Sequence, residues 1–381
     1  MEKLDGINPK RIEWCLRDHS ISLGQCADDV DISINTLEKV MAGETGLTFA
    51  QLKKLGAYFG RTALFFLEAG PVKQDDVRSP EFRSLLNQKV EVSRAVKRVI
   101  QLAEWQREIY VELAGDLGAE DGVKFSPPSL QGVHPKLAAK KAREWLRGGA
   151  NSFQSYRQLL EENGVLVFRT NGYAGKWQIP KENPILGFSL FDPSHPLIVV
   201  KKQRAEARQT FTLAHELGHI LLHRMSSIDD ESDLFSHRGK EAEANKFAGY
   251  FLVPDETLAE IDDDERPDHV AEFDSWLSKS RAALGVSTEV ILLRLIDAGR
   301  LSQSKYQAYR SWIENRVVDD EDSGSRKFRH REPRHILGDR YVRVIFDALE
   351  RNKISITKAS KYLDDVKLSD LRELERFCAN H

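Results

Sequence analysis

The sequence contains little that would suggest a secreted or membrane-bound protein. Among its 381 residues there are only three cysteines, Cys15, Cys26 and Cys378, and no two of them have metal-ligand spacing. We therefore expect buried or free thiols in a reducing compartment rather than a disulfide framework. No apolar run reaches 18 residues, and the first residues contain no apolar signal segment, so neither a membrane span nor a signal peptide is predicted. These absences predict a cytoplasmic protein with no membrane partner.

The charge balance also lacks a dominant sign. Lysine and arginine number 56 against 59 aspartates and glutamates, a net charge of −3, so the balance does not demand a polyanionic partner. No internal repeat of useful length and no phosphate-binding loop occur. The chain is long enough for two or three domains, and its composition is that of an ordinary globular protein.

The most informative segment is His215-Glu216-Leu217-Gly218-His219. Two histidines four residues apart share one face of a helix, so both imidazoles can reach one Zn²⁺ at about 2.0–2.1 Å. Glu216 lies beside the place of a metal-bound water and can accept its proton. Apolar residues on nearly every side of this helix predict that it is buried: Phe211, Leu213, Ala214, Leu217, Ile220, Leu221 and Leu222. A metal would satisfy the buried polar groups, and the pattern is the zinc metalloprotease signature.

A second helix, predicted over residues 239–252 and ending before Pro254, can supply a third ligand. Glu243 shares a face with Phe247, which directs its carboxylate toward the core, where it needs a metal or a cation. We therefore predict Glu243 as the third metal ligand. Glu241, expected to face solvent, is the second choice.

These two motifs together resemble the ImmA/IrrE family of bacterial and phage metallopeptidases. The resemblance rests on His215 to His219, on Glu243-Ala-Asn-x-Phe-Ala248 and on Leu252-x-Pro254, and it covers roughly residues 135–300. It implies that the two histidines and a glutamate of the second helix hold zinc, and that Glu216 is the catalytic base. It also implies cleavage of a phage-repressor-like transcription factor, which would switch on the repressed genes.

Residues 9–67 predict five short helices, of which Ser22 caps the second and Ser33 begins the third. The spacing of these two helices resembles the lambda-repressor-like (Xre-type) helix-turn-helix domain. Possible contacts with DNA or a partner lie on the third helix: Asn35, Thr36 and Lys39.

The charge of this module argues against strong DNA binding. Residues 1–66 carry eight cations and nine anions, a net charge of −1, and the supposed recognition region is acidic. Because DNA affinity comes largely from phosphate neutralisation by lysine and arginine, DNA binding is expected to be weak. Docking of a protein is the alternative for this module.

Four stretches are predicted along the chain: a helix-turn-helix domain over 1–70, a linker and long helix over 71–130, a zinc metallopeptidase domain over 131–312, and a charged linker with a C-terminal helical unit over 313–381. The long helix, at about 88–117, can pack on its own chain or form a dimer seam. Strands are predicted at 164–168, 185–191 and 197–200, and the last two are candidate edge strands for an extended substrate.

The sequence therefore predicts an α+β protein, mainly helical, with a zincin-like metallopeptidase domain that contains a small sheet. The predicted function is a Zn²⁺-dependent endopeptidase that cleaves a helix-turn-helix repressor to switch on phage, mobile-element or stress genes. The alternative is a DNA- or protein-binding regulator, antitoxin-like, whose zinc domain senses rather than cuts. The residue that stabilises the oxyanion is left open among Tyr250, His223 and His237.

Overall fold

A computed structural model of the chain divides into two compact units, residues 1–86 and 87–381. The residues that it describes are 3–18, 21–59, 61–70, 72, 85, 88–89, 92–118, 124–172, 175–236, 238–315 and 326–379. Most of residues 71–85, the start of the predicted linker, and residues 316–325 of the predicted charged linker lie outside them. The second unit contains the predicted long helix, the predicted metallopeptidase stretch and the C-terminal helices together.

The N-terminal unit is helical. Its elements are α1 (Pro9–Asp18), α2 (Leu23–Val30), α3 (Ile34–Met41), α4 (Phe49–Phe59) and the 3₁₀ turn η1 (Leu64–Phe66). Ser22 caps α2 as predicted, since its hydroxyl accepts from the Gln25 amide at 3.1 Å. Ser33, predicted to begin the third helix, is the N-cap of α3, and its hydroxyl accepts from the Thr36 amide at 3.3 Å. The fifth predicted helix is a single 3₁₀ turn that buries Phe65 and Phe66 in the core of this unit.

A mixed four-stranded sheet forms the centre of the second unit, in the order β1-β3-β2-β4. Its strands are β1 (Leu166–Arg169), β2 (Ile185–Leu190), β3 (Leu197–Val200) and β4 (Ser227–Asp230). β1 runs parallel to β3, while β2 is antiparallel to both β3 and β4. The sequence did not predict β4. Since β2 and β3 are the two inner strands, the prediction that they offer free edges is wrong; β4 and β1 are the outer strands.

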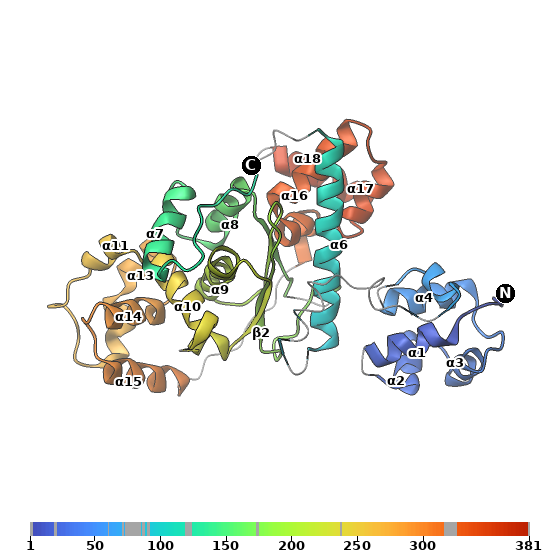
Figure 1. Cartoon of the computed structure of the whole chain (residues 1–381), viewed down its shortest axis with the longest axis horizontal. Coiled ribbons are helices and arrows are strands. Elements are labelled where there is room, and N and C mark those ends of the chain that lie inside the picture. Colours follow the sequence, from blue (N-terminus) through green and yellow to red (C-terminus); the bar gives the residue numbers. More distant parts are fainter. Residues whose placement is uncertain are drawn as a thin grey trace. The chain divides into compact units, whose positions relative to one another are not determined.

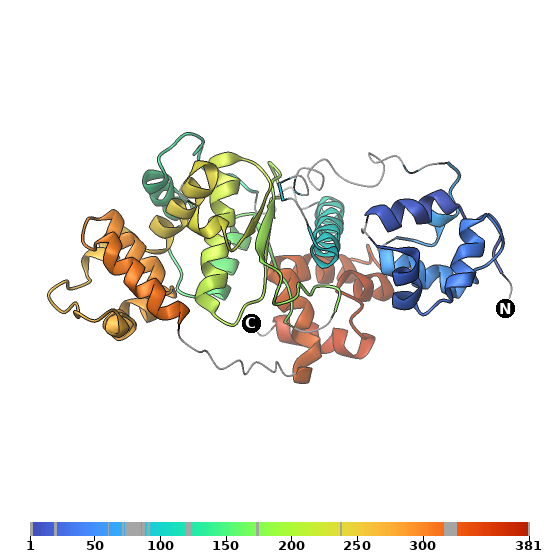
Figure 2. The ribbon, with the colours of Figure 1, turned by 90° about the horizontal axis from the view of Figure 1, so that it is seen from below.

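Helices cover both faces of this sheet (Figures 1 and 2). On one face lie α8 (Phe153–Glu162) and α9 (Glu206–Gly218), and α9 continues as a π-helical turn, η4 (His219–His223). α10 (Gly239–Leu252) packs closely against α9 and α7 (Pro135–Trp145). On the other face lie α6 (Arg94–Asp116) and α16 (Glu332–Glu350). The predicted long helix therefore packs within its own chain.

The remaining helical elements of the second unit surround these layers. They are η5 (Asp233–Phe235), α11 (Asp255–Ala259), η6 (Val270–Glu272), α12 (Phe273–Trp276), α13 (Ser278–Leu284), α14 (Thr288–Asp297), α15 (Gln303–Glu314), η7 (Arg326–Arg331), α17 (Ile356–Tyr362) and α18 (Leu368–Ala379). None of the helices in the described part of the chain combines the length and apolarity needed to cross a membrane.

A buried ion pair on α8 joins this helix to α16 in the C-terminal part of the chain. Arg157 of α8 lies 3.1 Å from Glu161 and donates to the carbonyls of His335 and Ile336 at 2.8 and 2.9 Å. The other oxygen of Glu161 accepts from the amides of Asp339 and Arg340, both at 3.0 Å, and so caps the helical segment that follows Gly338. Gly338 has a φ of 84°, and a side chain there would collide with Glu161.

Candidate metal centre

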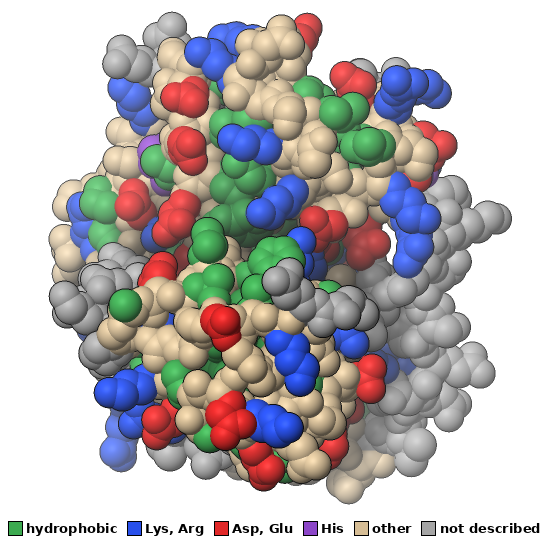
Figure 3. Space-filling model, turned by 90° about the vertical axis from the view of Figure 1, so that its right-hand side faces the viewer, with side chains coloured by type: hydrophobic (Ala, Val, Ile, Leu, Met, Phe, Trp, Pro, Cys, Tyr) green, Lys and Arg blue, Asp and Glu red, His purple; other side chains and the backbone are tan. Residues whose placement is uncertain are grey.

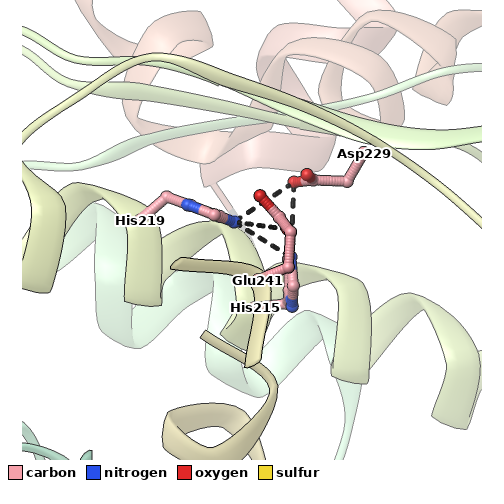
Figure 4. Close-up of side chains that lie close together, drawn as sticks. All are labelled: His215, His219, Asp229 and Glu241. Atoms are coloured by element: carbon pink, nitrogen blue, oxygen red, sulfur yellow. Dashed lines mark hydrogen bonds and ion pairs between the residues drawn. The ribbon is translucent and has the colours of Figure 1, made fainter. Parts of the chain in front are cut away.

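Four side chains from three elements converge beside the sheet (Figure 4). His215 and His219 extend from α9 and its π-helical continuation, Glu241 from the first turn of α10, and Asp229 from β4. One ligand atom from each residue lies within 4.8 Å of the other three. The first two were predicted from their spacing, whereas nothing in the sequence pattern pointed to Asp229.

The two imidazoles face each other through the same ring nitrogen. Nε2 of His215 lies 3.0 Å from Nε2 of His219, and Oε2 of Glu241 lies 3.3 and 3.2 Å from these two atoms. Both histidine side chains are buried, at 0% and 1% exposure. Two buried nitrogens and a carboxylate oxygen that point at one another in this way form a donor set suited to a divalent cation such as Zn²⁺.

Glu243 does not join this cluster. Its carboxylate is 57% exposed and lies 3.0 Å from Nε2 of His223. Small residues let α10 approach α9 closely and so determine which face of α10 meets it. A Cβ at Gly218 would lie only 3.2 Å from the Cα of Ala244. Glu241 lies three residues before Ala244 on that same face and therefore reaches the histidines. Glu241 replaces Glu243 as the candidate third ligand.

Glu243 instead begins a chain of hydrogen bonds that ends at the cluster. Nδ1 of His223 lies 3.1 Å from Nδ1 of His219, and Nε2 of His223 faces Glu243. If Nε2 of His223 donates to the carboxylate, its Nδ1 must accept from Nδ1 of His219. His219 then keeps the lone pair of Nε2 for the cluster, which is the arrangement in which partners outside a metal site orient a histidine ligand.

Glu216, which the sequence predicts to be the base, lies buried next to the cluster. Its Oε2 accepts from the hydroxyl of Ser227 at 3.1 Å, while Oε1 is buried and has no hydrogen-bond partner among the described residues. Burial and the neighbouring Asp229 carboxylate raise the pKa of Glu216. Gly187 of β2 leaves the space that this side chain needs, because a Cβ at that position would lie 3.1 Å from Oε1.

The two carboxylates of the cluster give it a charge that favours a cation. Burial lowers the pKa of His215, but the carboxylates of Asp229 and Glu241 outweigh that effect and raise it to about 9. The same contacts lower the pKa of Glu241 against the effect of its partial burial. Without a metal, a proton on His215 takes the place of the positive charge that both carboxylates favour.

A pocket of about 260 Å³ adjoins the site. It is bounded by Leu186 of β2, by Phe211 and Thr212 of α9, one turn before Glu216, and by residues of α14 and α15. Arg208, Glu231 and Arg310 give it charged walls beside these apolar side chains. The pocket therefore offers both apolar and charged surface to a ligand.

The outer edge of β4, beside the cluster, is covered by the chain itself. The carboxamide of Gln88 donates to the carbonyl of Ser226 at 2.9 Å and accepts from the amide of Ile228 at 3.2 Å, as a peptide group of a neighbouring strand would. Lys89 lies 2.8 Å from Asp230 and also binds Asp233. These contacts hold the strand that carries Asp229.

Tyr250, a candidate from the sequence for stabilising the oxyanion, is not a member of the cluster. The ring of Tyr250 packs under the guanidinium of Arg294, whose Cζ lies 3.9 Å from the ring centroid. His237 lies outside the described residues. On α3 of the N-terminal unit, Asn35 and Lys39 are exposed, and the hydroxyl of Thr36 bonds to that of Ser33.

The fold and the donor set define a domain with a candidate metal centre. Residues 161–295 match the family described as the IrrE N-terminal-like domain, of the M78 peptidases. The chain is 35% identical over 91 residues to the uncharacterized immunity region protein 2 of Bacillus phage phi105, an alignment that covers 23% of this chain and 56% of that protein. It is also 35% identical over 78 residues to the radiation response metalloprotease IrrE of Deinococcus radiodurans, covering 19% of this chain and 23% of that protein. The chain thus spans about half of the first relative and about a quarter of the second.

Proposed function

We propose that the chain is a zinc-dependent endopeptidase in which His215, His219 and Glu241 hold the metal. The observation that carries this proposal is the convergence of their three ligand atoms at 3.0–3.3 Å beside the buried carboxylate of Glu216. When bound, a zinc ion would supply Lewis acidity toward the scissile carbonyl and acidify a water molecule.

The protein's own residues provide the proton transfer. Oε1 of Glu216, which has no hydrogen-bond partner among the described residues, is the atom that accepts a proton from water. The Ser227 hydroxyl fixes the other oxygen, so that the carboxylate keeps one orientation. A raised pKa suits this role, because a base that is too weak cannot hold the proton that it must return to the leaving amine.

We infer that the substrate is a helix-turn-helix transcriptional repressor, cut to switch on phage, mobile-element or stress genes. The names of the two relatives, an immunity region protein of a phage and a radiation response metalloprotease, support this class of role. An extended substrate segment would pair with β4, the outer strand next to the cluster, in place of the Gln88 carboxamide.

The substitution Glu216→Gln tests the proposal, with the exposed Glu162→Gln as a matched control. Incubation with candidate helix-turn-helix repressors from the same genome should give fragments with the unaltered protein and with the control, but none with Glu216→Gln, while all three retain zinc. If the Glu216→Gln protein still regulates its genes normally in cells, and no fragment forms with the unaltered protein, the sensing regulator is the better description.

A further inference from the structure

Asp229 is the member of the cluster that the two sequence motifs do not supply, and its position calls for an explanation. The inference below rests on the proposed metal centre. Asp229 is 2% exposed, and its Oδ2 lies 2.8 Å from the Ser227 hydroxyl, whose single proton it shares with Oε2 of Glu216. A carboxylate that is this deeply buried is costly unless a cation or several hydrogen bonds compensate for its charge.

The strand geometry directs Asp229 toward α9. Ser227 and Asp229 are two residues apart on β4, so both face the same side of the sheet, where Glu216 lies. The register of β2 against β4 shifts between Ile185 and Gly187, opposite Asp229 and Asp230. Such a bulge changes the direction of nearby side chains, and Gly187 leaves the space between the strand and the helix open.

Five of the six distances among the four ligand atoms lie near those of a tetrahedron of donors, and the sixth, between Asp229 and Glu241, is at most 4.8 Å. With metal–ligand bonds of about 2.0–2.1 Å, tetrahedral ligand atoms lie about 3.3–3.4 Å apart. The three separations among the histidine nitrogens and Glu241 are 3.0, 3.2 and 3.3 Å. Oδ2 of Asp229 lies 3.4 and 3.7 Å from the nitrogens of His215 and His219, so it fits as the fourth vertex.

The histidine ring nitrogen that a carboxylate approaches shows whether the carboxylate is a metal ligand or only supports a ligand. A carboxylate that only orients a histidine ligand binds the ring nitrogen that does not face the metal. Asp229 instead approaches Nε2 of both histidines, the same atoms that face Glu241, whereas the Nδ1 of His219 is engaged by His223. Asp229 therefore lies among the ligand atoms.

We propose that Asp229 is a fourth protein ligand of the metal and that the centre shown by this structure is closed. Catalytic zinc sites keep three protein ligands and one open position, whereas four protein ligands close a site. Asp229 fills the position that water or a scissile carbonyl would need. A catalytic cycle then requires Asp229 to leave the metal, through movement of β4 or rotation of its side chain.

Zinc affinity tests this proposal without any measurement of activity. Zinc dissociation constants are measured by chelator competition for the full-length protein, for Asp229→Asn and for Asp229→Ala. The exposed Asp264→Asn, outside the cluster, is the matched control. Both changes at Asp229 should weaken zinc binding by at least tenfold, and the control should change it less than threefold. The asparagine variant keeps the shape of the side chain, so a folding defect confined to the alanine variant does not obscure the result.

Cobalt substitution tests whether the fourth position is closed. The visible absorption of the Co²⁺ form of the unaltered protein should hardly respond to added azide, whereas that of Asp229→Ala should respond strongly, because azide enters the vacated position. Equal zinc affinity in all variants, or an equal response to azide, overturns the role of Asp229 and leaves the three-ligand peptidase standing. Failure of all forms to cleave a repressor overturns the proposed function but does not affect the assignment of Asp229 as a metal ligand.

Discussion

Nδ1 of His223 lies 3.1 Å from Nδ1 of His219, so two histidines one turn apart are joined by the ring nitrogens that face away from the metal centre. Glu243 binds His223, and Glu241 approaches His219. These two acidic residues of α10 therefore have different roles. One supports a ligand from the surface, and the other lies in the centre itself.

This division predicts losses of zinc binding of different size for two conservative substitutions. Glu241→Gln should abolish stoichiometric zinc retention, because an amide oxygen replaces a charged ligand between two histidines. Glu243→Gln should weaken zinc binding by about tenfold or less, as expected for a partner outside the metal site. Metal analysis after gel filtration, followed by chelator competition, measures both. Full zinc in Glu241→Gln and none in Glu243→Gln would restore the assignment made from the sequence.

The buried pair of Arg157 and Glu161 should be expensive to break. Glu161→Ala leaves the guanidinium buried without its partner and removes the cap from the amides of Asp339 and Arg340, so we expect a loss of about 3–5 kcal/mol. Denaturant unfolding of the second unit measures this loss. The exposed neighbour Glu162→Ala serves as the control and should change stability by no more than about 0.5 kcal/mol. Comparable losses in the two variants would show that the pair does not hold the C-terminal helices.

Gly187 should tolerate no side chain. A Cβ there would lie 2.8 Å from Cγ2 of Thr212 and 2.9 Å from the carbonyl of Val199, so the strand or the metal helix must shift. Gly187→Ala should cost about 1–3 kcal/mol and also weaken zinc binding, since the helix carries both histidines. Gly115→Ala on α6, where nothing lies within 4 Å, is the control and should be neutral or stabilising by up to about 1 kcal/mol. Unchanged zinc affinity in Gly187→Ala would separate this glycine from the site.

The stability of the protein should depend on pH through Asp364, a residue outside the metal centre. Burial raises its pKa to about 6, and its side chain is 20% exposed. The folded state therefore holds a proton that the unfolded state releases between about pH 4 and 6, so stability falls as pH rises through that window. Asp364→Asn should remove this loss, with a gain on the order of 1–2 kcal/mol that grows from pH 4 to pH 6 and then levels off. Denaturant unfolding at several pH values measures it; a gain independent of pH, or one matched by the exposed Asp365→Asn, would contradict the assignment.

Weak DNA binding remains the expectation for the N-terminal unit. On the face of the molecule seen in Figure 3, acidic and basic side chains are interspersed, and neither sign forms a continuous patch. A salt titration of the purified chain on duplex DNA should show micromolar or weaker binding with a shallow salt dependence, because few phosphates are neutralised. Nanomolar binding with a steep salt dependence at one sequence would restore a conventional repressor role for this unit.

Much of the scaffold around the site could be predicted because its residues repeat at helical or strand spacing. The second helix was predicted over 239–252 and is α10, Gly239–Leu252; the strand at 197–200 is β3. β4 was missed because Ser-Ile-Asp-Asp has no run of β-branched or aromatic residues, and its polar side chains serve the centre rather than an apolar core.

The choice between Glu241 and Glu243 shows what helical spacing cannot decide. Glu243 and Phe247 do share a face, and Phe247 is buried, yet the helix begins near the surface and leaves Glu243 largely exposed. The face that meets α9 is determined by the close approach of Gly218 and Ala244, a contact between two helices that no pattern within one helix records.

The side-chain amide of Gln88 lies where a fifth strand of the sheet would begin. Exposed strand edges pair readily with the sheets of other molecules, and proteins block them with charges or with covering segments. Gln88 occupies the backbone groups of Ser226 and Ile228, and Lys89 adds a charge at the same edge. The sheet is thereby protected at β4 against edge-to-edge association, and two copies of the chain cannot merge their sheets there until this short segment moves away.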